Sequence, residues 1–459
     1  MAKITFIEPA SDFNAYAFAR LPLLGTLYLG TMLKQQGHDV KIMSENIQNI
    51  YDEEKNRLDE KILSSDIVGF STMTPTVNRG YQIADAIREQ KPNTKIMFGG
   101  PHVSSMPEEA LQHGDVVVQG EAEGVISDAI NGNGSPKVIK GKLLEDLDEL
   151  PFPDFSLLDE KPNIKRLAPI ATSRGCPFDC TFCSVSSLFG RKYRFRSADN
   201  ILGELQMRVE KGYQKFFFYD DNFGASKEIA KTMLDGVLTR NLKFKWLAQS
   251  RVEIVKDEEL LDMMSRSNCE YIFVGFESAN PNALKGLNKR QDVEDIRRCI
   301  DLLHKHNIKV HGMFMIGADE DDVSTIEHTV KFCRDMNIDL AQFSILFPIP
   351  GTQLYDELES QGRIFTKNWS WYDGTHVVFH PKKISLIDLQ EKFLWTWKKF
   401  YSMRRWKLYL FSRYLLSKWE RCNKQFWEWF REFADKTQDF WESGVSGVRN
   451  KNIGQPPHE

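Results

Sequence analysis

The chain has 459 residues, of which 41% are hydrophobic and 27% are charged. At roughly 150 residues per domain this length predicts about three domains, and the composition is that of a folded globular protein. No stretch approaches the roughly 18 apolar residues of a membrane span, and the opening MAKITFIEPA lacks the apolar run of a secretory signal. These features exclude a single small binding module and predict a cytoplasmic protein.

Residues 1–140 alternate short apolar runs with amphipathic stretches, the pattern of an α/β, doubly wound (Rossmann-like) domain with a covered parallel sheet. Such domains bind ligands beyond the carboxyl ends of their strands. Small and polar residues stand there in this sequence: Glu8, Ser71, Thr72, Gly99, Gly100, His102, Gly120 and Glu121. We expect the glycines to let a ligand approach the backbone closely.

A linker predicted over residues 141–165 contains PFPDFSLLDE, and a second alternation of strands and helices follows it. Six strand-like segments end near residues 173, 221, 250, 278, 317 and 348. Six repeats are too few for a closed eightfold barrel, so we predict an open, partial (β/α)6 barrel over residues 166–375. Residues 376–459 lose the strand signal and predict a C-terminal helical region.

Seven cysteines, an odd number in a large chain, argue against a disulfide framework. Three of them, Cys176, Cys180 and Cys183, fall within SRGCPFDCTFC, just after the first predicted barrel strand. Thiolates at this spacing suit zinc, copper(I) or an iron–sulfur cluster. The other four lie in apolar-periodic segments, where small buried hydrophobes are expected: Cys269, Cys299, Cys333 and Cys422.

A structural zinc site needs four ligands close together. No histidine lies between His113 and His304, and no fourth cysteine precedes Cys269. Three ligands with one open position suit a [4Fe–4S] cluster better, with zinc and unligated thiols as the alternatives.

The spacing C-x3-C-x2-C, with the aromatic Phe182 before the last cysteine, resembles the signature of the radical SAM superfamily. The resemblance implies that the open iron of the cluster binds S-adenosylmethionine (SAM) and that the bound SAM yields a 5′-deoxyadenosyl radical. Supporting residues are expected at the C-terminal ends of the barrel strands.

Three groups at those strand ends each have a functional and a structural explanation. Asp221 and Asn222 either hold the SAM amino group or cap the following helix. Arg251 either grips the SAM carboxylate or forms a surface ion pair. Glu277, followed by Ser278, resembles the ribose-binding position of the family, and an ordinary solvated strand end is the alternative.

The doubly wound domain ahead of this barrel resembles the cobalamin-binding domain of cobalamin-dependent radical SAM enzymes. The resemblance extends over residues 1 to about 360 and includes GFSTMTPTV, GGPHVSSMPEEAL and VVQGEAEG. The chain lacks Asp-x-His-x-x-Gly, so the resemblance implies a corrinoid without a histidine ligand, and His102 is expected to be a loop residue near the corrin edge. A domain that kept its fold and lost its ligand is the alternative.

The resemblance implies an enzyme that methylates an unactivated carbon. One SAM would methylate cob(I)alamin, and a second would provide the radical that takes hydrogen from the substrate before methyl transfer. A radical cyclase or oxidoreductase with the same cofactors is the alternative, and a corrinoid or metal carrier without catalysis is disfavoured. The expected partners are a small-molecule substrate and a reducing protein such as flavodoxin or ferredoxin.

The C-terminal region is basic and aromatic. Residues 392–424 contain ten Lys or Arg and one acidic residue, Glu420, and nine of the ten tryptophans follow residue 368. Three explanations stay open: a cap over one end of the barrel, a peripheral contact with the anionic inner face of a membrane, or nucleic-acid binding, which is the least favoured. Membrane contact would favour a lipid or isoprenoid substrate.

Overall fold

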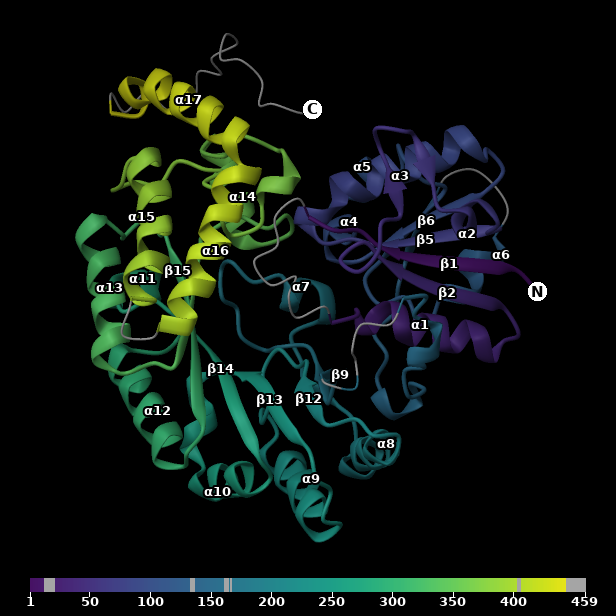
Figure 1. Ribbon diagram of the computed structural model, residues 1–459, viewed down its shortest axis with the longest axis horizontal. Coiled ribbons are helices and arrows are strands. Elements are labelled where there is room, and N and C mark those ends of the chain that lie inside the picture. The colour runs from purple at the N-terminus through teal and green to yellow at the C-terminus, as the bar shows by residue number, and fades with distance from the viewer. Residues whose placement is uncertain (12–20, 133–136, 161–164, 166, 403–405, 443–459) are drawn as a thin grey trace. The chain divides into compact units, whose positions relative to one another are not determined.

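The computed structural model describes residues 1–11, 21–132, 137–160, 165, 167–402 and 406–442 (Figure 1). The chain forms two compact units. The first contains Met1–Phe178, Ser184–Ser250 and Lys256–Ile272, and the second contains Asp179–Cys183, Arg251–Val255 and Phe273–Glu459.

The N-terminal part of the first unit is a six-stranded sheet in the order β2-β1-β5-β6-β7-β8, with all neighbouring strands parallel. Its strands are β1 (Lys3–Glu8), β2 (Asp39–Ser44), β5 (Ile67–Ser71), β6 (Lys95–Gly99), β7 (Val116–Gln119) and β8 (Lys137–Lys140). Strands β1 and β5 to β7 are mostly buried, as in parallel sheets covered on both faces. The predicted doubly wound sheet is therefore confirmed.

Helix α1 covers one face of this sheet, and α3 with α5 covers the other (Figure 1). The helices are α1 (Leu24–Gln35), α2 (Glu60–Leu63), α3 (Val77–Gln90), α4 (Pro101–Ser105), α5 (Pro107–Ala110) and α6 (Ile126–Asn131), and β3 (Tyr51–Asp52) and β4 (Arg57–Leu58) form a small hairpin. Because the strands are parallel, Glu8, Ser71, Gly99 and Gln119 end at the same edge of the sheet.

The second sheet has six strands in the order β16-β15-β14-β13-β12-β9, with β9 and β16 at its edges. The strands are β9 (Ala168–Ile170), β12 (Lys215–Phe218), β13 (Lys245–Ser250), β14 (Cys269–Glu277), β15 (Lys309–Ile316) and β16 (Leu340–Ile345), and β10 (Ser173–Arg174) pairs with β11 (Arg194–Phe195) in a separate two-stranded sheet. The predicted open barrel of six strands is thereby confirmed.

The barrel helices begin where the sequence supplies caps. They are α7 (Val185–Phe189), α8 (Ala198–Glu210), α9 (Lys227–Thr239), α10 (Glu258–Arg266), α11 (Pro281–Gly286), α12 (Val293–Lys305), α13 (Val323–Asp335) and α14 (Gln353–Ser360). Ser197, Ser226, Asp257, Asp292 and Asp322 each accept a backbone N–H hydrogen bond at the start of a helix.

Three helices, α15 (Leu386–Phe400), α16 (Trp406–Cys422) and α17 (Lys424–Glu442), form the C-terminal region within the described residues (Figure 1). Helix α15 covers the edge strand β16: Trp397 Nε1 donates to the carbonyl of Phe343 at 3.2 Å, and the Tyr401 hydroxyl bonds both backbone groups of Ala341. A covered edge cannot pair with another strand, so this packing supports the cap explanation. No described helix is long and apolar enough to cross a membrane.

Candidate active site

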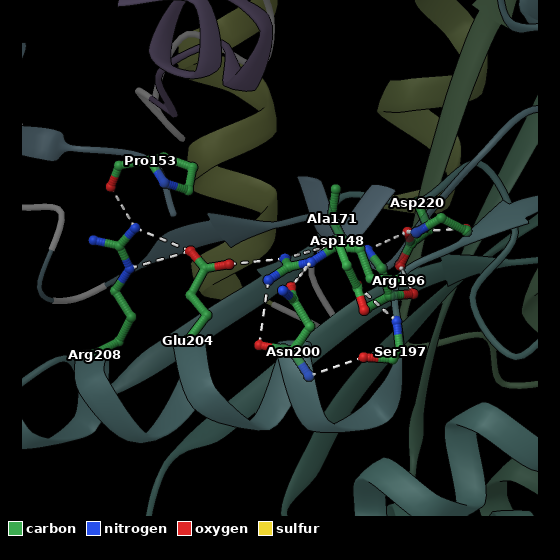
Figure 2. Close-up of polar contacts among 11 residues, drawn as sticks. Asp148, Pro153, Ala171, Arg196, Ser197, Asn200, Glu204, Arg208 and Asp220 are labelled. Carbon is green, nitrogen blue, oxygen red and sulfur yellow. Dashed lines mark hydrogen bonds and ion pairs between the residues drawn. The ribbon is translucent and has the colours of Figure 1, made fainter. Parts of the chain in front are cut away.

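The three motif cysteines lie on the loop between β10 and α7, and the chain leading to them is fixed by Asp220. This buried carboxylate follows β12 and accepts four hydrogen bonds of 2.6–3.0 Å, two from backbone N–H groups and two from hydroxyls of Thr172 and Ser173 (Figure 2). The loop therefore starts from a defined position at the C-terminal end of the barrel strands.

A second anchor comes from Glu204 on α8, which is fully buried. Figure 2 shows its carboxylate between Arg196 (2.8 Å) and Arg208 (3.0 Å). Arg196 donates to the carbonyl of Ala171 at 2.9 Å, and Arg208 donates to the carbonyl of Pro153 at 2.6 Å. Through these two arginines, Glu204 of α8 connects to the linker and to the segment between β9 and β10 that leads to the cysteines.

Glu121, predicted to contact a ligand beyond β7, is buried against two arginines. Its carboxylate accepts hydrogen bonds of 2.6 and 2.8 Å from Arg194 and lies 3.5 Å from Arg174, which also pairs with Glu123 at 2.7 Å. Burial acts to raise the pKa of Glu121, but these arginines hold it below its usual value. Glu121 therefore ties the loop after β7 to β10 and β11.

The motif cysteines differ in environment from the remaining ones. Cys176, Cys180 and Cys183 are half-buried and form no disulfide among the described residues. The Cys176 Sγ lies 3.8 Å from the Tyr193 hydroxyl, and the Cys180 Sγ lies 3.8 Å from Arg251. By contrast, burial raises the pKa of three other thiols, which confirms their expected place in the core: Cys269, Cys299 and Cys333. The prediction is wrong for Cys422, which is exposed.

Arg251 and Glu277 are both buried, at 5% and 7% exposure, so neither structural alternative holds. Arg251 forms an ion pair with Glu253 at 3.1 Å, but this pair is not at the surface. Glu277 pairs with Lys289 at 2.6 Å instead of facing solvent. Its backbone has φ +63°, which is rare for a residue with a side chain and marks local strain. The neighbouring Ser278 is buried and accepts the backbone N–H of Asn280.

Asp221 and Asn222 do not cap the following helix, because Ser226 caps α9. Asn222 instead donates to the Tyr193 hydroxyl at 2.7 Å and accepts a hydrogen bond from Ser250 at 3.2 Å. Asp221 is half-buried, and burial, followed by the charge of Asp220, raises its pKa to about 7. Phe182 is half-buried on the cysteine loop.

Two of the three predicted glycines at the edge of the N-terminal sheet leave space for a ligand. A Cβ on Gly120 would meet nothing within 4 Å, and one on Gly99 would meet only a carbonyl at 4.0 Å. Gly100 is different: with φ +108°, its Cβ would lie 2.4 Å from the Thr72 carbonyl oxygen. At Gly100 the neighbouring backbone fills the Cβ position, so the fold itself requires glycine there. Ser71 is half-buried at the end of β5.

His102 is not the loop residue that we expected. Pro101 begins α4, and His102 is fully buried there, with its ring nitrogens 3.3 Å from the Thr74 hydroxyl and 3.4 Å from Glu109. The other two histidines of the N-terminal domain also have partners: His38 accepts the backbone N–H of Ala2, and His113 contacts Asp85.

The donor set of the cysteine loop fits a [4Fe–4S] cluster. It offers three half-buried cysteine side chains on one loop, and each cysteine of such a cluster binds its own iron. Within the part of the chain that the structure describes, no three His, Cys, Asp or Glu side chains are grouped around one metal ion. A multi-iron cluster does not require such a group.

Sequence reasoning named Glu8 but missed Lys289. Glu8, at the end of β1, is buried and accepts hydrogen bonds from the Thr26 hydroxyl at 2.6 Å and the Leu23 N–H at 3.1 Å. Lys289, the partner of Glu277, lies between α11 and α12. The break between two helical patterns at GLNKRQ is the one signal that could have drawn attention to Lys289.

Comparison with known proteins agrees with this architecture. The profile of the radical SAM superfamily matches residues 170–333, and that of the B12 binding domain matches residues 13–130. Bacteriochlorophyllide d C-12(1)-methyltransferase of Chlorobaculum tepidum is 31% identical over 340 residues, which cover 72% of this chain and 73% of that protein. Anaerobic magnesium-protoporphyrin IX monomethyl ester cyclase of Rubrivivax gelatinosus is 26% identical, with 90% of this chain and 79% of that protein covered.

A solved structure shows the same fold. The radical SAM methyltransferase TsrM of Kitasatospora setae matches with a TM-score of 0.66 and 17% identity, covering 79% of this chain and 78% of that one. Because both domain profiles match and a relative is more than 30% identical along most of its length, this chain belongs to the cobalamin-dependent radical SAM enzymes.

Proposed function

We propose that this enzyme transfers a methyl group to an unactivated carbon of a small-molecule substrate. The observation that carries the proposal is the position of Arg251, whose buried guanidinium lies 3.8 Å from the Cys180 Sγ. A planar guanidinium beside a cluster ligand suits a bidentate grip on the SAM carboxylate. The relative named for methylation of bacteriochlorophyllide d supports methyl transfer over other radical reactions.

The cofactors are a [4Fe–4S] cluster, SAM and cobalamin. In this proposal Cys176, Cys180 and Cys183 hold the cluster, with Phe182 beside them. Bound, the cofactors supply a 5′-deoxyadenosyl radical that removes a hydrogen atom from the substrate and a methyl donor that replaces it. The chain orients these groups and excludes water.

The SAM-binding residues of the proposal come from three barrel strands. Arg251 binds the carboxylate, Asp221 and Asn222 hold the amino group, and Glu277 with Ser278 faces the ribose. Burial of Arg251 and Glu277 strengthens their electrostatic contacts with a bound ligand, because little water screens them.

The N-terminal edge residues divide into two roles. Ser71, Gly99 and Gly120 contact the corrinoid, because space is open at the two glycines. Thr72, Gly100, His102 and Glu121 support that edge through their contacts within the chain. The domains of this proposal are residues 1–140 for cobalamin, 141–165 as linker, 166–375 for SAM chemistry and 376–459 at the C-terminus.

Methyl-deuterated SAM tests the proposal. Anaerobically reconstituted enzyme with reductant and substrate should give 5′-deoxyadenosine and a product that carries the intact CD3 group. A product without the label would overturn methyl transfer and favour cyclisation or oxidation, the reaction class for which the Rubrivivax relative is named. Cys180→Ala should give neither product, whereas the buried Cys299→Ala should behave like the wild type.

The proposal includes two partners. A reducing protein of the flavodoxin or ferredoxin type supplies electrons to the cluster. An anionic membrane surface binds the outer face of α16, where Leu410 and Tyr414 are 56% and 60% exposed and Arg413 and Arg421 are also exposed. Exposed apolar side chains beside arginines suit the headgroup region of a bilayer. Membrane contact favours a lipid or isoprenoid substrate.

A further inference from the structure

Residues 287–291, hereafter the 287–291 segment, connect α11 to α12. Asn288 and Arg290 have φ +51° and +52°, so the backbone twice enters the left-handed region within three residues. This conformation costs free energy for residues other than glycine and persists only where surrounding contacts impose it. The contacts of this segment therefore show what imposes its conformation.

Its first contacts are with the cysteine loop. The Leu287 carbonyl accepts the N–H of Thr181 at 3.2 Å, and Asn288 Nδ2 donates to the Asp179 carbonyl at 3.1 Å. Arg290 forms an ion pair with the Asp179 carboxylate at 2.9 Å. The segment thus holds the stretch of loop that carries Cys180 and Cys183.

Lys289, in the middle of the segment, contacts both proposed SAM-binding side chains. Its carbonyl accepts a hydrogen bond of 2.8 Å from Arg251, and its Nζ donates to Glu277 at 2.6 Å. The Lys289 and Glu277 side chains are only 7% and 9% exposed. One residue therefore fixes the positions of a guanidinium and a carboxylate from two different strands.

The surroundings of this ion pair leave it little freedom. A Cβ on Gly275 would lie 2.6 Å from Glu277 Oε1 and 2.9 Å from Lys289 Nζ, so a larger residue at this position would displace the pair. Gln291 Nε2 donates to the carbonyls of Phe276 at 2.8 Å and Gly275 at 3.3 Å. The segment is thereby hydrogen-bonded to the end of β14 as well.

We propose that Lys289 is a positioning residue that orders the SAM site, setting the Glu277 carboxylate through its ammonium and the Arg251 guanidinium through its carbonyl. The inference rests on the SAM-binding roles proposed above for Glu277 and Arg251. Lys289 acts on SAM through these residues and needs no contact with it.

Equilibrium dialysis of SAM against the reconstituted, unreduced enzyme tests this inference without turnover. Lys289→Met should raise the SAM dissociation constant about 10- to 100-fold, the usual loss when a group that orients a ligand-holding residue is removed. Lys289→Arg should restore most of the affinity, because it keeps the charge. Lys285→Met, at an exposed lysine on α11, is the matched control and should bind SAM like the wild type.

A double variant separates positioning from direct binding and from misfolding. Lys289→Met leaves Glu277 buried without its cation, whereas Glu277→Gln with Lys289→Met removes both charges and should fold with full iron and sulfide content. If Lys289 acts through Glu277, the double variant should bind SAM no more weakly than Glu277→Gln alone. Fully additive losses, or wild-type affinity in Lys289→Met, would overturn the inference. Unchanged affinity in Glu277→Gln would instead overturn the proposed role of Glu277.

Discussion

Adjacent carboxyl groups at the end of β12 have different environments. Asp220 receives four hydrogen bonds from Thr172 and Ser173, which oppose the rise in its pKa that burial causes. Among the described residues no such set of donors reaches Asp221, and burial raises its pKa to about 7. Asp220 is thus the structural anchor of the cysteine loop, whereas Asp221 can change its protonation near neutral pH.

Glu8 is a second carboxyl group whose pKa burial raises to about 7, although Thr26 and Leu23 donate hydrogen bonds to it. Because its unfolded value is 4.5, the folded protein binds an extra proton between these pH values. The stability that this proton contributes is complete below the unfolded pKa and is lost as the pH rises through about 7. The shift corresponds to at most about 3 kcal/mol.

Glu8→Gln should therefore stabilise the protein at pH 8 by about 1–3 kcal/mol and have a much smaller effect at pH 4.5. The amide oxygen can still accept the hydrogen bonds of Thr26 and Leu23 without a buried charge. Urea unfolding of both proteins at the two pH values measures the difference. Glu54→Gln, at an exposed glutamate, serves as the control. An equal change in stability at both pH values would show that ionisation of Glu8 is not the cause.

A cluster of four charged residues, three of them buried and Arg174 half-buried, joins the loop after β7 to the two-stranded sheet β10-β11. Its members are Glu121, Glu123, Arg174 and Arg194. Arg174 also lies over the ring of Tyr28 on α1, 5.5 Å from its centroid. Arg174 precedes Cys176 by two residues. The cluster therefore fixes the start of the cysteine loop against the loop after β7.

Breaking this cluster at Arg194 should be costly. Arg194→Met leaves the Glu121 carboxylate buried without its closest cation, and we expect a loss of about 3–5 kcal/mol in the free energy of unfolding. Adding Glu121→Gln removes the unpaired charge and should recover much of the loss. Urea denaturation of the single and double variants at pH 7 checks this. A double variant less stable than Arg194→Met would mean that Glu121 is held by other contacts.

The elements were predictable from the sequence because their signals are local. Buried strands such as YIFVGFE and caps such as Ser226 or Asp292 determine where elements begin and end. Parallel topology then places the ends of the strands, and with them Arg251 and Glu277, at one edge. The partners of buried charged side chains were not predictable. Glu121 and Arg194, for example, are 73 positions apart in the sequence and meet only in the fold. His102 was misjudged because GGPH resembles a loop, although Pro101 is well suited to begin a helix.

In the molecule as a whole, the excess of positive charge lies in the C-terminal region. Residues 381–459 carry an excess of seven positive charges within a chain of net charge −4. Helix α16 buries Leu416 and Trp419 on its inner face, whereas Leu410, Arg413, Tyr414 and Arg421 lie on its exposed face at helical spacing. The inner face acts as cover for the fold, and the outer face is free for the proposed membrane contact. Arg404 and Arg405, and the side chain of Trp406, lie outside the described residues.

Binding to vesicles should depend on both components of this outer face. Each basic residue near an anionic bilayer contributes about 1 kcal/mol, which fades with salt, and burying Leu410 and Tyr414 adds an apolar contribution. The enzyme should therefore sediment with vesicles of phosphatidylglycerol and phosphatidylcholine at low salt, and less at high salt or with phosphatidylcholine alone. Leu410→Ser with Tyr414→Ser should weaken binding, whereas Leu143→Ser, at an exposed leucine of the linker, should not. Equal sedimentation with and without anionic vesicles would leave α16 as a structural cover only.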